Sequence, residues 1–556
     1  MVYVITQSCC KDTSCVPVCP VDCIRPVGKP GEFTDTEMLY IDPVMCIECG
    51  LCFEACPVDA IYDEKDLPPD LARFRDINAT YFERNPLDSD IAPVKSDHAA
   101  VAPGALRVAI VGAGPSACYA ANELTRVGGV EVDLFERLPT PFGLVRFGVA
   151  PDHLHTKSVV DVFEPAFTNP RFGCHLNVEV GRDITHEDLL VHHHAVIYGV
   201  GASSRSRDLG IPGEQLPGNN AAADFVAWYN GHPDHAGDVF DLSSERAVII
   251  GNGNVALDVA RVLLLGPDEL VKSDIAEHAL AALADSKIRE VVMLARRGPR
   301  AAAYSVGEFW ALGHLPGIDV IIDSDDLQPH PDDDVEARLK LDIAREFAQR
   351  TPDPGNKRIV LRFLTSPVEL IGERHVTGLR LVHNRVDESG RLVPGDPAAG
   401  TELIETSLVL RAIGFYGTPI EGLPFDAASG TIPNADGRVL GEQDQPLPGV
   451  YVTGWIKRGP SGVIGTNRTC AEQTVARLWQ DFDAGVLAGD VADRAALERL
   501  LRDRGADPVD WWGWRAIDAA ERKRGADASR PRVKLVHISD MLTAARGSPA
   551  ARAARS

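Results

Sequence analysis

The chain has 556 residues and a mass of 60.0 kDa, more than one hydrophobic core supports, which predicts about three or four domains. Its formal net charge is -24 and its isoelectric point lies near 5.1, which argues against general affinity for nucleic acid or anionic membranes, because both require basic surfaces. No apolar run approaches the roughly 20 residues that span a bilayer, and the start "MVYVITQSCC" lacks the basic and apolar regions of a secretory signal, so we expect a cytoplasmic protein.

Cysteines are concentrated near the N-terminus, where nine of the twelve lie between Cys9 and Cys56. The stretch "CIECGLCFEACP" has the spacing CxxCxxCxxxCP. Its first three thiolates, Cys46, Cys49 and Cys52, can surround one iron–sulfur cube, whereas Cys56 lies too far along to join them. In two-cluster ferredoxins this last cysteine ligates the other cluster, so the spacing predicts a second copy of the motif upstream.

The second copy is "CCKDTSCVPVCP", in which Cys9, Cys15 and Cys19 keep the spacing and Asp12 replaces the second cysteine. A hard carboxylate is a poorer ligand than thiolate for iron in a sulfide cage. This site is therefore expected to hold a three-iron cluster or a labile four-iron cluster, unless the neighbouring Cys10 substitutes. Both copies continue alike, as "CPVDCI" and "CPVDAI", which indicates an internally repeated α+β fold.

Residues 1–66 thus resemble a bacterial two-cluster ferredoxin. The resemblance implies crossed ligation, and the two ligand sets are Cys19, Cys46, Cys49 and Cys52 for one cluster and Cys9, Cys15 and Cys56 for the other. Cys23 has no place in the motif and is interpreted as a spectator thiol. A zinc site also uses paired CxxC thiolates, but zinc explains neither the duplicated copy nor the trailing Cys-Pro.

The following segment, residues 67–103, is rich in proline, charge and small side chains and is expected to be a linker. Within it, residues 71–84 could form a helix that packs on either neighbour. No chemistry is assigned to this segment.

A dinucleotide-binding unit begins at "LRVAIVGAGPSACYAANEL", which reads as a strand, a glycine turn and a helix. Gly112 permits the tight turn, Gly114 lets a pyrophosphate approach the backbone, and the small Ser116 allows the helix to pack closely on the strand. The next apolar run ends at Glu136, where an acid can accept a hydrogen bond from a ribose hydroxyl. The unit therefore predicts FAD or NAD binding.

A second unit of the same kind begins at "RAVIIGNGNVALDVARVLL", with Gly251, Gly253 and Ala256 at the turn. Its next strand ends in Arg296 and Arg297 in place of an acid. A basic pair suits the 2′-phosphate of NADP, which a carboxylate would repel. The alternative interpretation is a solvated strand edge.

The chain beyond residue 408 contains a strand, a glycine-rich loop and a helix in "PLPGVYVTGWIKRGPSGVIGTNRTCAEQTVARL", and this helix could direct its N-terminus at a flavin. We therefore expect an α/β fold with two Rossmann-like, doubly wound domains. The FAD-binding domain would be discontinuous, comprising residues 104–210 and 409–556, and the NADP-binding domain, residues 211–408, would be inserted in it.

Three adjacent histidines, residues 192–194, precede an apolar strand. Neighbouring side chains cannot all face one ion, so they are interpreted as a surface turn and not as a metal site.

Residues 104–556 resemble ferredoxin–NADP reductases of the adrenodoxin reductase type, on the strength of "GAGPSACYAANEL", "PTPFGLVRFGVAPDH", "GNGNVALDVAR", "RRGP" and "GWIKRGPSGVIGTN". The resemblance implies FAD contacts at Ser116, Glu136, Leu144, Val180, Arg207, Trp455, Gly462, Val463 and Ile464. It implies NADP contacts at Gly253, Asn254, Val255, Ala256, Arg296, Arg297, Glu308 and Gly462. It also makes His153 and Glu308 the candidate catalytic residues.

Together these features predict an oxidoreductase that exchanges electrons between NADPH and iron–sulfur clusters through FAD, because a flavin converts a hydride into single electrons. The expected partners are NADPH and a one-electron acceptor, either the fused ferredoxin or an external one. Two alternatives remain: an electron-input subunit resembling the small subunit of glutamate synthase, and a non-enzymatic electron carrier or redox sensor. A disulfide reductase is disfavoured, because Cys118, Cys174 and Cys470 form no CxxC pair.

Overall fold

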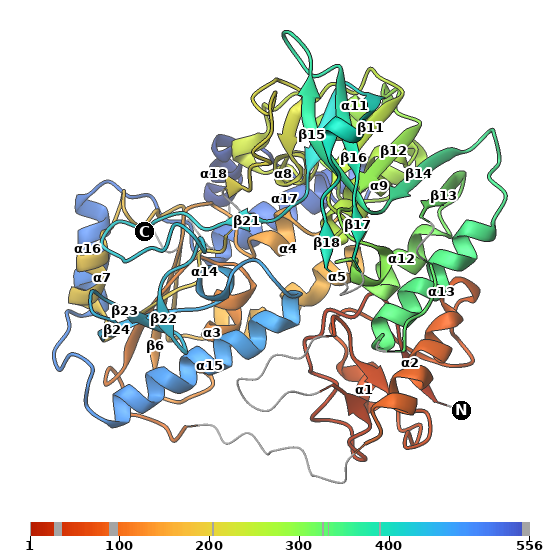
Figure 1. Cartoon of the computed structure of the whole chain (residues 1–556). Coiled ribbons are helices and arrows are strands. Elements are labelled where there is room, and N and C mark those ends of the chain that lie inside the picture. The colour runs from red at the N-terminus through yellow and green to blue at the C-terminus, as the bar shows by residue number, and fades with distance from the viewer. Residues whose placement is uncertain are drawn as a thin grey trace.

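The computed structural model describes residues 2–26, 36–87, 98–202, 205–324, 327–331, 333–387 and 391–547 (Figure 1). They form a small N-terminal module and two α/β units, each of which is built on one large sheet. None of the helices in these ranges combines the length and the apolar character needed to cross a bilayer.

The N-terminal module consists of two short antiparallel strand pairs and a one-turn helix. Strand β1 (Tyr3–Ile5) pairs with β4 (Ile61–Asp63), and β2 (Ile24–Arg25) pairs with β3 (Tyr40–Ile41). Helix α1 (Leu51–Ala55) lies within the second cysteine motif. Each strand pair thus joins one strand beside the first cysteine motif to one beside the second. Their buried apolar side chains form a common core of Val4, Ile5, Ile24, Leu39, Ile41 and Ile61.

Helix α2 (Arg73–Arg84) covers this core, although it falls in the segment expected to be a linker. Its buried face carries Phe74, Ile77 and Phe82 at helical spacing. Asn78, which is also buried, donates to Ile5 O at 2.8 Å and accepts from the Ile41 amide at 2.8 Å. The first part of the segment is therefore packed structure, and residues 88–97 lie outside the described residues.

The larger sheet has seven strands in the order β22-β23-β24-β8-β5-β6-β7. Its five parallel strands are β5 (Arg107–Val111), β6 (Glu131–Glu136), β7 (Phe172–Leu176), β8 (Ala195–Tyr198) and β24 (Pro446–Val452), while β22 (Asn434–Ala435) and β23 (Arg438–Leu440) complete one edge in antiparallel pairing. Helices α3 (Pro115–Thr125) and α15 (Ile464–Asp483) pack against each other beside this sheet. Segments more than 230 residues apart in the chain thus share one sheet.

The second sheet has six strands, all parallel, in the order β10-β20-β11-β12-β14-β13. The strands are β10 (Asn219–Ala221), β11 (Arg246–Ile250), β12 (Glu290–Leu294), β13 (Ile318–Asp323), β14 (Lys357–Arg362) and β20 (Leu408–Arg411). The helices of this unit include α8 (Ala222–Tyr229), α9 (Asn254–Leu264), α11 (Glu277–Ala284), α12 (Val306–Leu312) and α13 (Val335–Gln349). Apolar runs such as "AVII" in β11 and "VVML" in β12 are buried throughout, as expected for a parallel sheet that helices cover.

Smaller elements complete the two units. An antiparallel sheet of β15 (Thr365–Ile371), β16 (Gly378–His383) and β19 (Glu402–Glu405) lies in the chain between β14 and β20 of the six-stranded sheet. Near the C-terminus lie α16 (Arg494–Asp503), α17 (Trp511–Asp527) and α18 (Ile538–Arg546). Helix α17 is anchored by the buried Glu521, which accepts two hydrogen bonds from Arg146 at 2.5 and 3.1 Å.

The interpretation of residues 192–194 as a surface turn is wrong. All three histidines are buried, at the end of α7 (His186–His192) and the entry to β8. His193 Nε2 lies 3.3 Å from Asp133 Oδ2, and His194 Nδ1 accepts from the Arg107 amide at 2.9 Å. Tertiary partners from β5 and β6 satisfy these rings, and the local sequence gives no sign of them.

The N-terminal module lies against both α/β units, below α12 and α13 and beside one end of α15 (Figure 1). Arg73 of α2 pairs with Glu346 of α13 at 2.5 Å and stacks over Trp310 of α12 at 4.4 Å from the ring centre. On the other side, the Gly465 amide of α15 donates to Cys10 O at 2.7 Å. The module is therefore docked on the rest of the chain through contacts on two sides.

Candidate functional site

The cysteines of the module gather around two separate cavities. The first is lined by Cys19 of the first motif together with Cys46, Cys49 and Cys52 of the second. Cys23 also borders it, with Sγ 3.4 Å from Cys19 Sγ, and this contact lowers the pKa of Cys19 to about 6. We call this cavity the outer thiol site, because Cys49 is exposed.

The second cavity is lined by Cys9, Cys15 and Cys56, with Cys10 and Asp12 beside them. Burial raises the pKa of Cys9 to about 11. We call it the inner thiol site, because its loop contacts α15. In both cavities the fourth-position cysteine comes from the other motif, so the chain brings together the two ligand sets that crossed ligation requires.

The donor chemistry of both cavities fits iron–sulfur clusters. Each is lined by at least three cysteine sulfur atoms. Burial raises the pKa of Cys9 in the inner site and of Cys52 in the outer site, so ionisation of these two thiols is opposed unless a cationic group binds. Soft thiolates are the ligands that iron–sulfur cages use. Cys23 is buried beside the outer site, and its role as a spectator thiol stays a prediction.

The first glycine turn connects β5 to α3 and is shaped to receive a phosphate. Gly112 has a φ of +95°, and a Cβ there would lie 2.7 Å from Gly199 O, so a side chain is excluded. A Cβ on Gly114, by contrast, would meet no atom within 4 Å, which leaves open space at the N-terminus of α3. Glu136 at the end of β6 is fixed by the Ala113 and Leu138 amides, which donate to its carboxylate at 2.9 and 3.0 Å. The turn and the acid fit a dinucleotide such as FAD.

Other expected flavin contacts converge on this turn. Leu144 begins α4 (Leu144–Phe147), and a Cβ on the preceding Gly143 would lie 3.0 Å from Gly114 Cα. Trp455 begins α14 (Trp455–Arg458), and a Cβ on Gly454 would lie 2.3 Å from Ser116 Oγ. Both residues thus start their helices where the backbone meets the start of α3.

The remaining expected flavin contacts lie around the same region. Val180 follows the segment in which Val178 donates its amide to Glu136 O at 2.9 Å. Arg207 stacks over Tyr416 at 4.7 Å, and the neighbouring Phe415 stacks against Trp455 at 6.5 Å. The last three contacts precede or open α15, namely Gly462, Val463 and Ile464.

The second glycine turn connects β11 to α9 and places the expected NADP contacts. Gly253 is the N-cap of α9, and Asn254, Val255 and Ala256 form its first turn. Asn254 accepts from the Ser305 amide at 2.8 Å and donates to Glu37 of the N-terminal module at 3.0 Å.

Arg296 and Arg297 lie just beyond the end of β12, and both are exposed. They stand at the carboxyl edge of the parallel sheet, the edge from which Gly253 starts α9. Open α/β sheets bind nucleotides at this edge, so the two arginines are placed to meet a phosphate.

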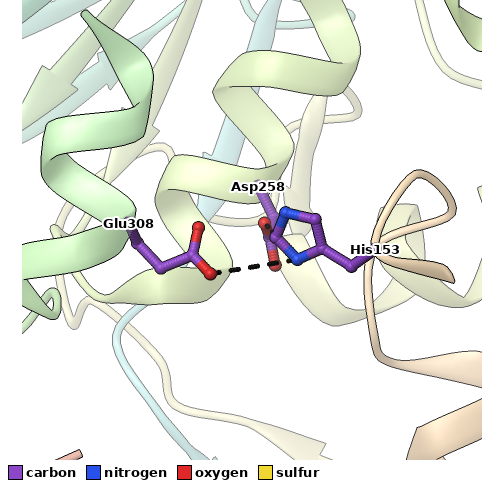
Figure 2. Close-up of side chains that lie close together, drawn as sticks. All are labelled: His153, Asp258 and Glu308. Carbon is purple, nitrogen blue, oxygen red and sulfur yellow. Dashed lines mark ion pairs between the residues drawn. The ribbon is translucent and has the colours of Figure 1, made fainter. Parts of the chain in front are cut away.

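His153 and Glu308 come from different units and face each other, and Asp258 of α9 lies beside them (Figure 2). His153 Nδ1 is 3.9 Å from Glu308 Oε1 and 4.0 Å from Asp258 Oδ1. Glu308 sits in the first turn of α12, where Ser305 caps the helix. The sequence analysis missed Asp258, although it lies one turn after Asn254 and hence on the same face of α9.

The three side chains can hold a proton near neutral pH. Burial raises the pKa of Asp258 to about 7. Burial acts to lower the pKa of His153, but the carboxylates of Glu308 and Asp258 raise it above its ordinary value. The nitrogen of His153 and the carboxylate oxygens of Asp258 and Glu308 lie within 4.8 Å of one another, a spacing that would also suit a metal ion. However, Arg261 already donates hydrogen bonds to Asp258 and Asp152 and offsets their negative charge. We therefore interpret the group as a shared-proton cluster.

Comparisons with known proteins agree with this geometry. Residues 39–62 match the 4Fe-4S binding domain family, and residues 106–298 match the pyridine nucleotide-disulphide oxidoreductase family. The chain is 45% identical over 563 residues to a Mycobacterium leprae protein named "Probable ferredoxin/ferredoxin--NADP reductase", an alignment that spans 99% of both proteins. It is also 45% identical over 459 residues to the "NADPH-ferredoxin reductase FprA" of Mycobacterium tuberculosis, which covers 78% of this chain and 98% of that protein.

A solved structure resembles the larger part of the chain. The structure titled "Mycobacterium tuberculosis FprA in complex with NADPH" superimposes with a TM-score of 0.74 at 44% identity, and it covers 80% of this chain and 100% of that chain.

Proposed function

The chain belongs to the ferredoxin/ferredoxin–NADP reductases, and on that premise we propose how its parts divide the reaction. Overall, one NADPH becomes NADP⁺ with release of a proton, while two iron–sulfur centres each gain one electron. FAD, when bound, supplies the conversion between a hydride and single electrons. The residues of the chain hold and orient the nucleotides, and we infer no side-chain nucleophile.

We assign FAD to the unit with the seven-stranded sheet and NADP to the unit with the six-stranded sheet. The first unit comprises residues 104–210 and 409–556, and the second, residues 211–408, is inserted in it. This assignment is supported by the sharing of one sheet between β8 and β24, with the six-stranded sheet between them in sequence. Gly112, Gly114 and Glu136 would hold the flavin nucleotide.

For NADP we propose that Gly253 to Ala256 receive the pyrophosphate and that Arg296 and Arg297 bind the 2′-phosphate. The shared-proton cluster of His153, Asp258 and Glu308 would orient the nicotinamide ring of NADP and hold a proton beside it. Its position between the two units supports this role, because His153 comes from the unit with the seven-stranded sheet, whereas Asp258 and Glu308 come from the unit with the six-stranded sheet.

We propose two clusters, each with its own cavity. The outer thiol site would hold a four-iron cluster on Cys19, Cys46, Cys49 and Cys52. The inner thiol site would hold the second cluster on Cys9, Cys15 and Cys56. The observation that carries this proposal is the gathering of the crossed cysteine sets around two separate cavities. The loop of the inner cavity accepts a hydrogen bond from the Gly465 amide, and Gly465 directly follows the expected flavin contacts 462–464.

The inner thiol site would then exchange electrons with the reductase, and the outer thiol site would face an external acceptor. Cys49 is exposed, and apolar side chains beside it remain solvent-accessible: Met45, Ile47, Leu51 and Phe53 are 43–57% exposed. Glu48 and Glu54 lie among them, so an acceptor with a basic rim would be favoured.

Anaerobic reduction by NADPH tests this division. The purified holoprotein is mixed with NADPH, and flavin absorbance, cluster absorbance and paramagnetic resonance spectra are followed together. We expect the flavin to respond first and two distinct cluster signals to change afterwards. Reduction of the flavin with no response from any cluster would refute the fused pathway, and a protein that binds only zinc would refute the cluster assignment.

A further inference from the structure

Asp12 stands at the one motif position where the cysteine is missing, but its side chain is directed at the reductase. The residue is buried, with 3% of its surface exposed. Tyr119 of α3 donates its hydroxyl to Asp12 Oδ2 at 2.5 Å. Arg468 of α15 donates to Asp12 O at 2.6 Å and lies 3.6 Å from Oδ1.

The other carboxylate oxygen is also engaged. Oδ1 accepts hydrogen bonds from the amide and the hydroxyl of Ser14. Each oxygen of Asp12 therefore has a donor from the protein. A carboxylate is also a hard donor in a site lined by soft thiolates. Ligation of iron by Asp12 would therefore break these hydrogen bonds and form a weaker iron–oxygen bond in their place.

The ionisation states of Tyr119 and Arg468 suit their contacts with Asp12. Burial raises the pKa of Tyr119 well above its ordinary value, so the phenol keeps its proton and remains a donor. Burial acts to lower the pKa of Arg468, but Asp12 raises it, and the guanidinium stays charged. Hydrogen bonds to a charged carboxylate are stronger than neutral ones, and removing one partner leaves the other uncompensated.

The surrounding backbone is shaped for the same contact. A Cβ on Gly465 would lie 1.7 Å from Lys11 O, so only glycine lets the cysteine loop approach α15 this closely. The Gly465 amide donates to Cys10 O at 2.7 Å. Amides at the start of a helix have no intrahelical partner, so the cysteine loop satisfies one of them. Gly465 follows directly after residues 462–464.

From these observations we propose that Asp12 is a docking residue: it holds the inner thiol site against the reductase through Tyr119 and Arg468 and does not ligate iron. The substitution at the motif position thus exchanges a cluster ligand for a contact between the modules. The role in electron exchange rests on the proposed function, whereas the docking role does not. Asp12, Tyr119 and Arg468 are positioning residues.

The docking role is tested with Tyr119→Phe and Arg468→Gln in the full-length holoprotein. Hydrogen–deuterium exchange is measured for the peptides that contain residues 9–15 and Gly465. We expect exchange to become about tenfold faster in each variant, because a hydrogen bond to a charged group is lost. The matched control is Tyr451→Phe, which removes a 2.6 Å hydroxyl contact to Asp481 in the same unit and leaves the module untouched. Variants that exchange like this control would overturn the proposal.

The consequence for electron exchange is measured in the same variants by anaerobic stopped flow with NADPH. We expect the flavin phase to keep its wild-type rate and the cluster phase to slow by about the same tenfold factor. A cluster phase at the wild-type rate, despite faster amide exchange, would overturn the positioning role. If the clusters of the wild-type protein do not respond to NADPH at all, the proposed function fails, and the exchange data still decide the docking role.

The absence of iron ligation is tested with Asp12→Asn, which keeps the shape and removes the charge. We expect the oxidised and reduced paramagnetic resonance spectra and the iron content to match the wild type, while amide exchange increases. A changed spectrum of the inner cluster, with iron lost, would show that Asp12 is a ligand and refute the proposal. If Asp12→Asn does not fold, the paramagnetic resonance spectra are measured for Tyr119→Phe instead. Loss of this hydrogen bond would change the spectrum of the inner cluster if Asp12 were a ligand, and it should leave the spectrum unchanged if Asp12 only docks the module.

Discussion

At the scale of the residue, the proposed NADP site depends on two arginines at the end of β12. Arg296 and Arg297 follow a buried strand and are exposed, and neither forms an ion pair with another of the described residues, so their charge is available to a ligand. Two guanidinium groups can form bidentate bonds to a phosphate, which no carboxylate at this position could do.

We predict that Arg296→Ala with Arg297→Ala raises the KM for NADPH by about 10- to 100-fold, because charge-assisted bonds to the 2′-phosphate are lost. The KM for NADH, which lacks this phosphate, should change by less than about threefold. Steady-state reduction of a dye with each nucleotide measures both values. Arg380→Ala, in β16, is the control arginine, since its partner is Glu369. Equal losses with NADPH and NADH would contradict the assignment.

His153 gives a pH-dependent contribution to stability. Its pKa in the folded protein is raised by Glu308 and Asp258, so the cation is favoured by folding. This stabilisation is fully present below the ordinary histidine pKa and is lost as the pH rises through the raised value. We predict that His153→Gln destabilises the protein by about 1 kcal/mol more near pH 6 than near pH 9.

Urea unfolding of the wild type and the variant at both pH values measures this difference. His155→Gln is the control, because both this ring and its partner Asp59, 3.6 Å away, are exposed, and exposed ion pairs contribute little to stability. A pH-independent loss in His153→Gln would show that the ion pairs do not contribute.

At the scale of the element, helix α2 decides where the N-terminal module ends. Apolar residues on one face cover the small core, and Asn78 bonds to both β1 and β3. A module of two short strand pairs buries little apolar surface by itself, so a covering helix contributes strongly to its stability. The helix also joins the module to α12 and α13 through Arg73.

We predict that Asn78→Ala lowers the stability of the module by about 2–4 kcal/mol, because buried backbone groups of Ile5 and Ile41 lose their partner. The loss of cluster absorbance during urea titration measures it. Asn85→Ala is the control, since its side-chain amide donates to Tyr81 O near the end of the helix, and its cost should stay below about 1 kcal/mol. Equal losses in the two variants would mean that Asn78 does not anchor α2.

At the scale of the whole molecule, the chain is a reductase with a docked iron–sulfur module. Docking fixes which thiol site meets the reductase, since Cys10 and Asp12 of the inner loop contact α15 and α3. A module on a long free tether would have no such preference. The packed α2 and the contacts on two sides therefore replace the flexible arrangement that the composition of residues 67–103 indicates.

We predict that residues 98–556 alone fold and keep NADPH-dependent ferricyanide reduction within about threefold of the full chain, because both nucleotide sheets are complete without the module. The reductase FprA, which aligns with 78% of this chain, supports the expectation. Paramagnetic resonance of this fragment should show no iron–sulfur signal. A fragment that folds but has lost dye reduction would show that the module completes the reductase site.

The sequence predicted the class of enzyme, and similarity to named proteins decided between the reductase and the two alternative functions. The shared identity of 45% over 99% of both proteins supports the reductase over the glutamate synthase subunit and the electron carrier. The coarse α/β fold of the reductase is confirmed. The assignments of individual cofactor contacts stay predictions, and the ligands of the two clusters do so as well.

The sequence alone determined the motifs whose geometry is local. A cysteine spacing sets how thiolates surround a cluster, and a glycine between a strand and a helix sets a turn, so Cys46 to Cys56 and Gly112 to Ser116 could be interpreted without a fold. Only the tertiary structure decided the role of Asp12, the burial of His193 and the place of Asp258 beside His153. Each depends on a partner from a distant part of the chain, or from a separate element, and no local pattern encodes which elements meet.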